Sequence, residues 1–523
     1  MARQKSDRCT VPKGRRKAVP THTDERGGGG KAATVKQQTG QLDLYRGTAE
    51  EPSAKASGTD GEAALHPRRA ATRAEPKPRH KRKQATSATM AEVTEHLAEA
   101  FEKVSSNQGA PGPDGQTIEK VREHLDDLLA ELTCALLNGT YTPGEIRRVW
   151  IPKAGGGERG LGIPNVVDRV VQEAVRRVLE PQYEPTFHAS SHGFRPERSC
   201  HTAIAEATKY LDDGHEWVVD LDLEKFFDRV NHQRLMARLA LRVKDRNLLV
   251  LIGKMLRAKV VLPDGVVVST EEGVPQGGPL SPLLSNIVLD ELDRELDERG
   301  HRFVRYADDC NIYVRTERAG QRVMASIVRF IERRLRLKVN TEKSAVARPE
   351  ERHFLGFRLR REPEGGEVEV LLSKRSKDRI DERIVELTPR NWGRSLQACI
   401  DQLNGYLVGW SGFFGICTDG IERTLMTLDA HIRRRLRAIQ VKHWKCKRTM
   451  ARKLTKLGVR SKLAWRSTYQ GKQSTWALSH TQAIHRGLRN AYFAERGLES
   501  LAEQWRSRAP LIVAPAQLTL ALG

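Results

Sequence analysis

Hydrophobic and polar positions over residues 303–314 form two apolar runs separated by a short polar break. The runs are rich in Val, Ile, Tyr and Phe, so the segment predicts a strand, a turn and a second strand. Residues 216–223 alternate as a strand does, with Val219 and Leu221 on one face and Asp220 and Asp222 on the other. We therefore expect Asp222 to lie at the end of this strand, beside the tip of the hairpin.

Other stretches predict helices and one more hairpin. Apolar positions recur at helical spacing over residues 93–104, 168–179 and 403–413 and again from Ser281 onwards. The aromatic stripe within 403–413 is more typical of a buried core than of base stacking. Residues 149–164 instead indicate a strand, a Gly-rich turn and a second strand. The pattern as a whole predicts a mixed α and β protein with a helical C-terminal part.

Adjacent carboxylates occupy the tip of the first hairpin. Asp308 and Asp309 repel each other unless a positive charge lies nearby, and a hard divalent cation with oxygen ligands is the usual partner. With Asp222, three carboxylates could converge, which is the arrangement that two-metal phosphoryl transfer needs. A solvated turn or a structural metal site would use the same residues.

The charge balance adds a class of partner. The 523 residues contain 89 Lys and Arg against 66 Asp and Glu, a net charge of +23, and a hydrophobic share of 38%. Such a surplus suits a nucleic acid, whose phosphates favour binding through counterion release, although a basic protein without a specific partner would share it. Chain length predicts two or three domains.

Cysteine usage and hydropathy exclude other classes. Seven scattered cysteines without a CxxC pair indicate neither a disulfide framework nor a zinc site. No stretch approaches 18 consecutive apolar residues, and no apolar segment follows the first residues, so we expect neither a membrane span nor a signal peptide. A cytoplasmic protein is the expectation.

Tyr306-Ala307-Asp308-Asp309 resembles the YxDD box of reverse transcriptases. Residues 274–282 resemble the PQG block of these enzymes, 193–201 the GFRPxRSxH block, 338–343 the LNxEK block and 354–357 the FLGF block. The order and spacing resemble those of group II intron reverse transcriptase/maturases of the bacterial type without an endonuclease, from about residue 104 to residue 501. His192 departs from the family, which usually has Tyr there.

The resemblance implies an α+β fold of the right-hand polymerase kind. Fingers and a palm with an antiparallel sheet would occupy residues 90–365, and an α-helical thumb or maturase X domain would occupy residues 375–505. Residues 1–89 carry 20 Lys and Arg against 9 Asp and Glu, and we expect them to form a disordered basic extension. Residues 506–523 would be a tail with no room for an endonuclease module, so the DNA primer would come from elsewhere.

The resemblance also implies residue roles at the reaction centre. Asp222, Asp308 and Asp309 would be catalytic and, with the main-chain carbonyl of Leu223, would bind two Mg²⁺ ions. The residues implied for the deoxynucleoside triphosphate (dNTP) are Lys153, Arg159, Phe227 and Gln276. The two cations suit the triphosphate, and the aromatic ring would exclude a 2′-hydroxyl, although plain core packing would also use it.

A second set is implied for nucleic acid. Gly277 would let the template strand approach the backbone closely. Basic residues interleaved with Trp444 and Trp465 suit structured RNA, through phosphate contacts and occasional stacking. The full set expected to bind template or RNA is Gly277, Arg433, Arg434, Arg435, Lys442, Lys445 and Arg448.

The function implied is RNA-directed DNA polymerase, with binding of the group II intron RNA that assists splicing and retrohoming. Its partners would be the intron RNA, an RNA template and a DNA primer or target, and a homodimer stays open. Two alternatives remain at this point. One is a domesticated or defence-associated reverse transcriptase without an intron, and the other is an RNA-binding splicing factor with an inactive polymerase.

Overall fold

The computed structural model describes residues 88–152, 157–362, 366–389, 391–470 and 474–512. The expected basic extension, apart from Ala88 and Thr89, and most of the expected C-terminal tail therefore lie outside the described residues. Lys153 and the middle of the Gly-rich turn also lie outside them.

A four-stranded antiparallel sheet contains the acidic hairpin. Its order is β6-β7-β3-β8, from Arg302–Tyr306 (β6), Asp309–Val314 (β7), Trp217–Leu221 (β3) and Ala345–Ala347 (β8). The predicted hairpin and the predicted third strand are both confirmed. The alternation in β3 is confirmed too, because Val218 belongs to one apolar cluster whereas Val219 and Leu221 belong to another.

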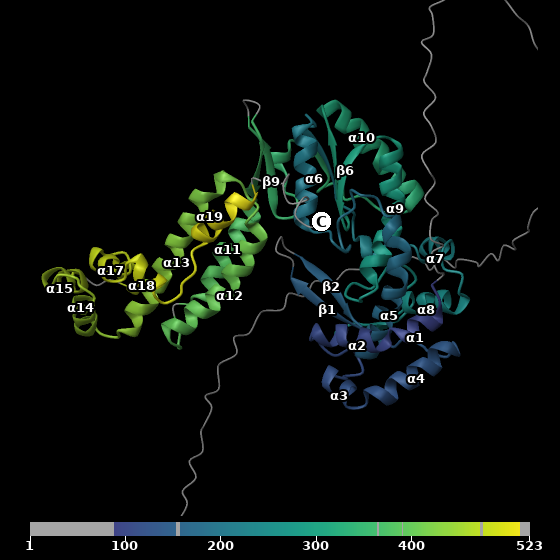
Figure 1. Cartoon of the computed structure of the whole chain (residues 1–523), viewed down its shortest axis with the longest axis horizontal. Helices are drawn as coiled ribbons and strands as arrows, with labels where there is room; N and C mark the ends of the chain where they lie inside the picture. Colours follow the sequence, from purple (N-terminus) through teal and green to yellow (C-terminus); the bar gives the residue numbers. More distant parts are fainter. Residues whose placement is uncertain (1–87, 153–156, 363–365, 390, 471–473, 513–523) are drawn as a thin grey trace, which may run out of the picture. The chain divides into compact units, whose positions relative to one another are not determined.

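Helices cover both faces of this sheet (Figure 1). Cys200–Asp212 (α6) packs against β6, and its Ala203, Ile204 and Ala207 share a cluster with Val218. Glu317–Phe330 (α10) contacts β3 and β8 on the other face. Ser281–Glu298 (α9) also contacts β6, and it begins where the PQG block ends, as predicted. The strand ends that carry the acidic residues thus rise from a sheet with a core on each side.

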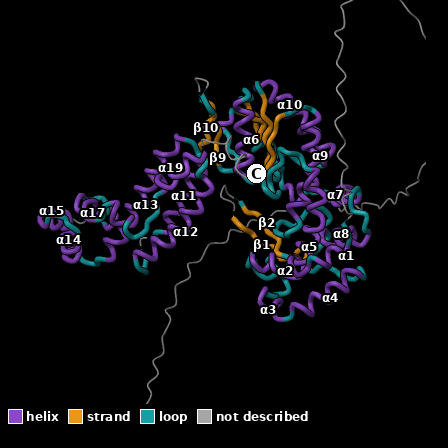
Figure 2. The backbone as a smooth tube through the Cα atoms, in the orientation of Figure 1, coloured by secondary structure: helices purple, strands orange, loops and turns teal. Residues whose placement is uncertain are grey.

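A second sheet has the order β2-β1-β4-β5, and its strands β1 and β2 are labelled in Figure 2. It is formed by Ile146–Pro152 (β1), Glu158–Ile163 (β2), Val260–Val261 (β4) and Val267–Val268 (β5). β1 and β2 form the predicted hairpin, with Ile151 paired to Arg159 and Pro152 to Glu158. The hairpin therefore presents Arg159 close to the turn.

Helices precede the second sheet in the chain and lie between its strands β2 and β4. They are Met90–Glu95 (α1), Leu97–Ser106 (α2), Ile118–Glu123 (α3), Leu125–Leu137 (α4), Val166–Tyr183 (α5), His232–Ala240 (α7) and Arg246–Leu256 (α8). The single helix expected over residues 93–104 is divided, because His96 leaves helical geometry with φ −91° and ψ 0°. The apolar stripe survives this break, since Val93, Leu97, Phe101 and Val104 are all buried.

The C-terminal part is helical, after a hairpin of Phe357–Arg361 (β9) and Val368–Leu372 (β10). Its helices are Lys374–Leu387 (α11), Leu396–Phe414 (α12), Glu422–His443 (α13), Lys447–Lys456 (α14), Ser461–Tyr469 (α15), Thr475–Leu478 (α16), Gln482–Gly487 (α17), Asn490–Ala494 (α18) and Leu501–Ile512 (α19). Leu403, Leu407 and Trp410 are buried in one apolar cluster, so the stripe in α12 is mainly core, as predicted.

The fold is thus a mixed α and β structure followed by a helical region. Among the described helices none combines the length and apolar composition that a membrane crossing requires. The cysteines of the described ranges are free thiols, in agreement with the absence of a predicted disulfide framework.

Candidate active site and nucleic-acid interface

The acidic turn is tight and conformationally unusual. Tyr306 and Asp309 form the last pair of the β6–β7 ladder, so only Ala307 and Asp308 lie between the strands. Ala307 adopts φ +56°, in the left-handed region that residues other than glycine seldom occupy. Because Leu221 pairs with Cys310 across β3 and β7, the next positions place Asp222 beside Asp309. The fold therefore brings together the three carboxylates that the sequence predicted.

Electrostatics show how closely these carboxylates interact. Desolvation, together with the charges of Asp308, Asp220 and Asp222, raises the pKa of Asp309 to about 7. Desolvation also raises the pKa of Asp308, an effect that Asp222 adds to and Arg159 opposes. Like charges that disfavour one another in this way favour a bound cation.

The donor chemistry therefore fits a divalent metal, although the side chains are not gathered into a finished metal site. Within the described ranges, no three His, Cys, Asp or Glu side chains form a cluster that could hold an ion. Lys343 Nζ lies 3.6 Å from Asp222 Oδ2 and supplies part of the neutralising charge.

The LNxEK block supports the strand end that carries Asp222. The backbone N–H of Asn340 donates to the Asp222 carbonyl at 2.8 Å, and the Ser344 hydroxyl accepts from the Asp222 N–H at 3.0 Å. Leu223 is buried and bridges to Val339. The segment after β3 is thus fixed on both sides, which limits where the Asp222 carboxylate can lie.

A cavity of about 920 Å³ lies near the turn, since Phe194 lines it and has its ring 6.3 Å from that of Tyr306. Arg159, Phe227, Gln276 and Gly277 line it, so four of the residues expected to contact the nucleotide or template share one space. Arg159 is exposed there, and its charge lowers the pKa of the Asp308 carboxyl against the larger effect of desolvation. A guanidinium near carboxylates is suited to a triphosphate bound between them.

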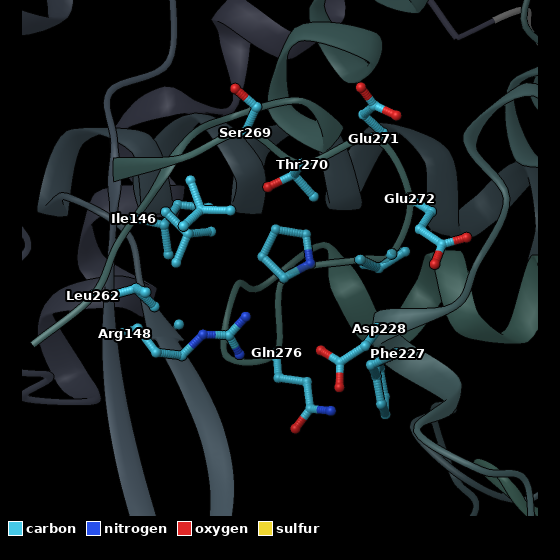
Figure 3. A pocket seen from close by; sticks show the side chains of 16 residues that line it. Ile146, Arg148, Phe227, Asp228, Leu262, Ser269, Thr270, Glu271, Glu272 and Gln276 are labelled. Atoms are coloured by element: carbon cyan, nitrogen blue, oxygen red, sulfur yellow. The ribbon is translucent and has the colours of Figure 1, made fainter. Parts of the chain in front are cut away.

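A neighbouring cavity of about 540 Å³ shares Phe227 and Gln276 with the first (Figure 3). In Figure 3 the Arg148, Gln276 and Asp228 side chains lie along one wall of it. Phe227 and Gln276 are thus the residues that both cavities contact. Phe227 is only 8% exposed, which holds its ring in place.

Gly277 has a role inside the protein. Its φ is +116°, and a Cβ there would clash with the carbonyl oxygen of Gly162 in β2. The Gly162 N–H in turn donates to the Gln276 carbonyl at 2.6 Å. Glycine is thus required for the PQG block to meet the β1–β2 hairpin, whatever nucleic acid contacts this segment also makes.

Phe194 is a cavity residue to which the sequence assigned no role. It lines the 920 Å³ cavity, is 49% exposed and adopts φ +59°. Its ring lies 6.3 Å from that of Tyr306. A bulky residue in left-handed backbone is strained, and such strain concentrates at functional sites. The only sequence signal was its place in the GFRP block.

The basic surface differs from the expectation at Arg435. This side chain is 9% exposed and donates to Thr388 Oγ1, to the Thr388 carbonyl at 2.7 Å and to the Val385 carbonyl at 3.2 Å. The prediction that Arg435 contacts RNA is therefore wrong, because its guanidinium holds the end of α11. The sequence could not show that Arg435 lies on the buried face of α13, because it is the last of three consecutive arginines.

The other expected cations remain accessible. Lys442, Lys445 and Arg448 are exposed, and Arg433 and Arg434 are half-buried. The Arg434 guanidinium lies 4.1 Å from the centre of the Trp476 ring. Lys442 Nζ donates to Asn391 Oδ1 at 2.6 Å, a surface contact that a phosphate could replace.

The two tryptophans interleaved with the basic residues differ in exposure. Trp444 is 5% exposed and packs in the core, so its ring is not accessible for stacking on a base. Trp465 is 38% exposed and stacks on Tyr469, with ring centres 5.5 Å apart and planes 15° apart. Lys447 Nζ lies 5.7 Å from the Tyr469 ring. The helices α14 and α15 thus present an aromatic pair among cations.

Comparison with known proteins agrees with this geometry. Residues 151–359, which include the sheet and its acidic turn, match the family described as "Reverse transcriptase (RNA-dependent DNA polymerase)". Residues 377–458 match the "Group II intron, maturase-specific domain". The chain belongs to the group II intron reverse transcriptase/maturase family, and its enzyme class is RNA-directed DNA polymerase.

Several relatives share the polymerase region. Protein YkfC of Escherichia coli is 36% identical over 319 residues, which cover 53% of this chain and 84% of that protein. Group II intron-encoded protein LtrA of Lactococcus lactis is 40% identical over 203 residues, 37% of this chain and 32% of LtrA. The putative COX1/OXI3 intron 2 protein of Saccharomyces cerevisiae is 36% identical over 203 residues, 38% of this chain and 23% of that protein. The chain thus spans about a third or less of the two intron proteins.

A solved structure, the partial Cas6-RT-Cas1–Cas2 complex, matches at 22% identity over 46% of this chain and 42% of that chain. The TM-score of 0.30 is too low for a comparison of the two folds.

Proposed function

We propose that the chain extends a primer 3′-hydroxyl with deoxynucleotides, copying an RNA template at the acidic turn. The observation that carries this proposal is the convergence of Asp222, Asp308 and Asp309 beside a cavity that Arg159 enters. The family implies divalent metal, and two Mg²⁺ ions bound by these carboxylates, with the Leu223 carbonyl, would activate the attacking hydroxyl and stabilise the leaving oxygen.

The chain's own residues would position the reactants. Arg159, together with Lys153, would hold the triphosphate, and Gln276 would lie against the sugar and base. The Phe227 ring is held in place by burial and lines the cavity, so it would clash with the 2′-hydroxyl of a ribonucleotide. Most of the rate enhancement would then come from positioning and from charge neutralisation.

The parts of the fold would have separate tasks. Residues 90–365 would form fingers, which include the β1–β2 hairpin, and a palm, which includes the β6-β7-β3-β8 sheet. Residues 375–505 would form the thumb or maturase X domain. This division rests on the position of the maturase-specific match and on the change from sheet to helix after β10.

The maturase region would bind the intron RNA. Residues 430–494 contain 17 Lys and Arg and not one Asp or Glu across 65 positions. Exposed members of this set, Lys442, Lys445 and Arg448, would contact phosphates, and the Trp465–Tyr469 pair would stack on unpaired bases. Binding of this kind would assist splicing, and reverse transcription of the same RNA into a DNA target would allow retrohoming.

Primer extension on an RNA template in Mg²⁺ tests the proposal. Asp308→Ala is expected to lower the extension rate by roughly 10³-fold or more, because it removes several kcal/mol of transition-state stabilisation. Asp127→Ala, a change at an exposed position of α4, is the matched control and should leave the rate unchanged. Absence of synthesis by the unmodified chain, with tight binding to structured intron RNA, would instead favour an RNA-binding splicing factor.

A further inference from the structure

A buried ion pair lies directly behind the acidic turn. Arg305, in β6, and Asp293, in α9, both have fully buried side chains. Arg305 Nε and Nη2 donate to the two Asp293 carboxylate oxygens at 2.6 Å each, which is a bidentate pair. An arginine in the middle of a strand would ordinarily be expected on the solvent face, so its burial here needs a physical reason.

The remaining donors of Arg305 reach three further residues, one on α9 and two outside it. Nη1 donates to the Ala307 carbonyl at 2.9 Å and to Asn286 Oδ1 at 3.0 Å, and Nη2 donates to Ser191 Oγ at 2.6 Å. All five N–H groups of the guanidinium therefore have an acceptor. One of these acceptors is the carbonyl of the residue that directly precedes Asp308.

The turn needs such support because its backbone is strained. Ala307 is held at φ +56°, a conformation that persists only where surrounding contacts impose it. The GFRP block supplies the opposite wall: a Cβ on Gly193 would clash with the backbone of Ala307. Asn286 Nδ2 donates to the Gly193 carbonyl at 2.8 Å, so the same helix that anchors Arg305 also anchors this wall.

We propose that Arg305, held by Asp293, is a positioning residue that fixes the Ala307 turn and thereby aims the Asp308 and Asp309 carboxylates. This inference rests on the proposed polymerase function of that turn. Its consequence is that loss of the guanidinium fork lowers the turnover of nucleotide addition while the nucleotide site and the RNA surface stay intact.

If the Arg305–Asp293 ion pair served stability alone, replacing both residues would not be expected to change kcat. Replacing a buried ion pair by apolar side chains is often neutral or stabilising, because neither charge then has to be desolvated. The ion pair therefore contributes little to stability alone, whereas a rigid planar guanidinium is well suited to fixing α9, the Ala307 turn and the Ser191 segment in one geometry.

The decisive variant is the double substitution Arg305→Met with Asp293→Leu, which removes both charges and leaves neither unpaired. We expect a melting temperature close to that of the unmodified chain and a KM for dNTP within about twofold of its value. The kcat should fall by roughly 10²-fold, because a misplacement of the reacting groups by about 1 Å can cause a loss of this size. Unchanged kcat per folded molecule would overturn the proposal.

Two further variants cover the case in which the double variant does not fold. Ser191→Ala removes one acceptor of the fork and keeps the ion pair, and it should lower kcat by a smaller factor with KM unchanged. Arg305→Lys keeps the charge without the fork and should not restore kcat. Restoration by lysine, or an unchanged kcat in Ser191→Ala, would show that only the charge matters and would overturn the proposal.

The matched control is Asp290→Asn. Asp290 lies on α9 one turn before Asp293, is 5% exposed and pairs with Arg238 and Arg294, but its ion pairs do not reach the turn. It should lower the melting temperature and leave kcat per folded molecule unchanged. Failure of the proposed function is distinguishable, because the unmodified chain would then lack synthesis in the same assay.

Discussion

Phe227 is the aromatic residue shared by the two cavities at the proposed reaction centre, and its role can be tested by comparison with its neighbour. Phe226 and Phe227 are consecutive, both are buried, and their rings are 5.2 Å apart. Phe227 lines both cavities, whereas Phe226 is absent from either lining. Truncation of either ring should therefore lower the stability of the fold by a similar amount, but only Phe227 can contact a bound nucleotide.

Phe227→Val is expected to relax discrimination against ribonucleotides, because a smaller side chain leaves room for a 2′-hydroxyl. A steric contact with one small group of a substrate changes discrimination between two substrates by roughly 10-fold to 200-fold. The measurement is the ratio of kcat/KM for a dNTP to that for the matching ribonucleotide. Phe226→Val should lose similar stability and keep the ratio, and an unchanged ratio in Phe227→Val would assign that ring to the core alone.

At this scale the sequence predicted the acidic site better than the cations. Adjacent aspartates at a turn could also be a solvated turn, and Asp308 and Asp309 were selected because their segment and the blocks around it resemble those of reverse transcriptases. Arg435 and Arg305 could not be classified in that way, because an arginine is buried only if specific acceptors surround it. Those acceptors, such as the Thr388 carbonyl, come from segments that only the fold brings near.

At the scale of elements, hydrophobic alternation located strands well and their pairing poorly. The β6–β7 hairpin follows from local pattern and turn length. The insertion of β3 between β7 and β8 does not, because it depends on which apolar faces meet across more than a hundred residues. The break at His96 was also missed, since a helical stripe continues through it without interruption.

Helix α15 offers a prediction for the RNA surface. Trp465→Ala should weaken binding of structured intron RNA by about 1–3 kcal/mol if one base stacks on this ring. Trp465→Phe keeps an aromatic face and should retain most of the affinity. The measurement is a filter-binding or anisotropy titration at fixed salt, with the melting temperature as a control for folding.

The outcome separates stacking from structure. Equal losses in the alanine and phenylalanine variants would mean that the indole packs against the protein rather than against a base. Equal retention in both would remove Trp465 from the RNA interface and leave the cations of α13 and α14 to carry binding.

At the scale of the whole molecule, charge is the dominant property. The net charge is +23, and the 65 residues from 430 to 494 hold 17 of the 89 Lys and Arg without an acidic residue. Sequence composition alone predicted a polyanionic partner, and the structure adds which cations can contact one. Lys442, Lys445 and Arg448 are exposed, whereas the Arg435 guanidinium is enclosed by backbone acceptors.

This contrast predicts the salt dependence of RNA binding. The logarithm of affinity should fall steeply with the logarithm of salt concentration, by about 0.7–0.9 for each phosphate contact. The triple variant Lys442→Ala, Lys445→Ala, Arg448→Ala should therefore reduce the slope by about 2 to 3 while leaving the melting temperature nearly unchanged. Arg435→Met should do the opposite, lowering the melting temperature and leaving the slope intact, because its charge already binds the end of α11. A slope that is flat in the unmodified chain, or equal in the two variants, would contradict recognition through these exposed cations.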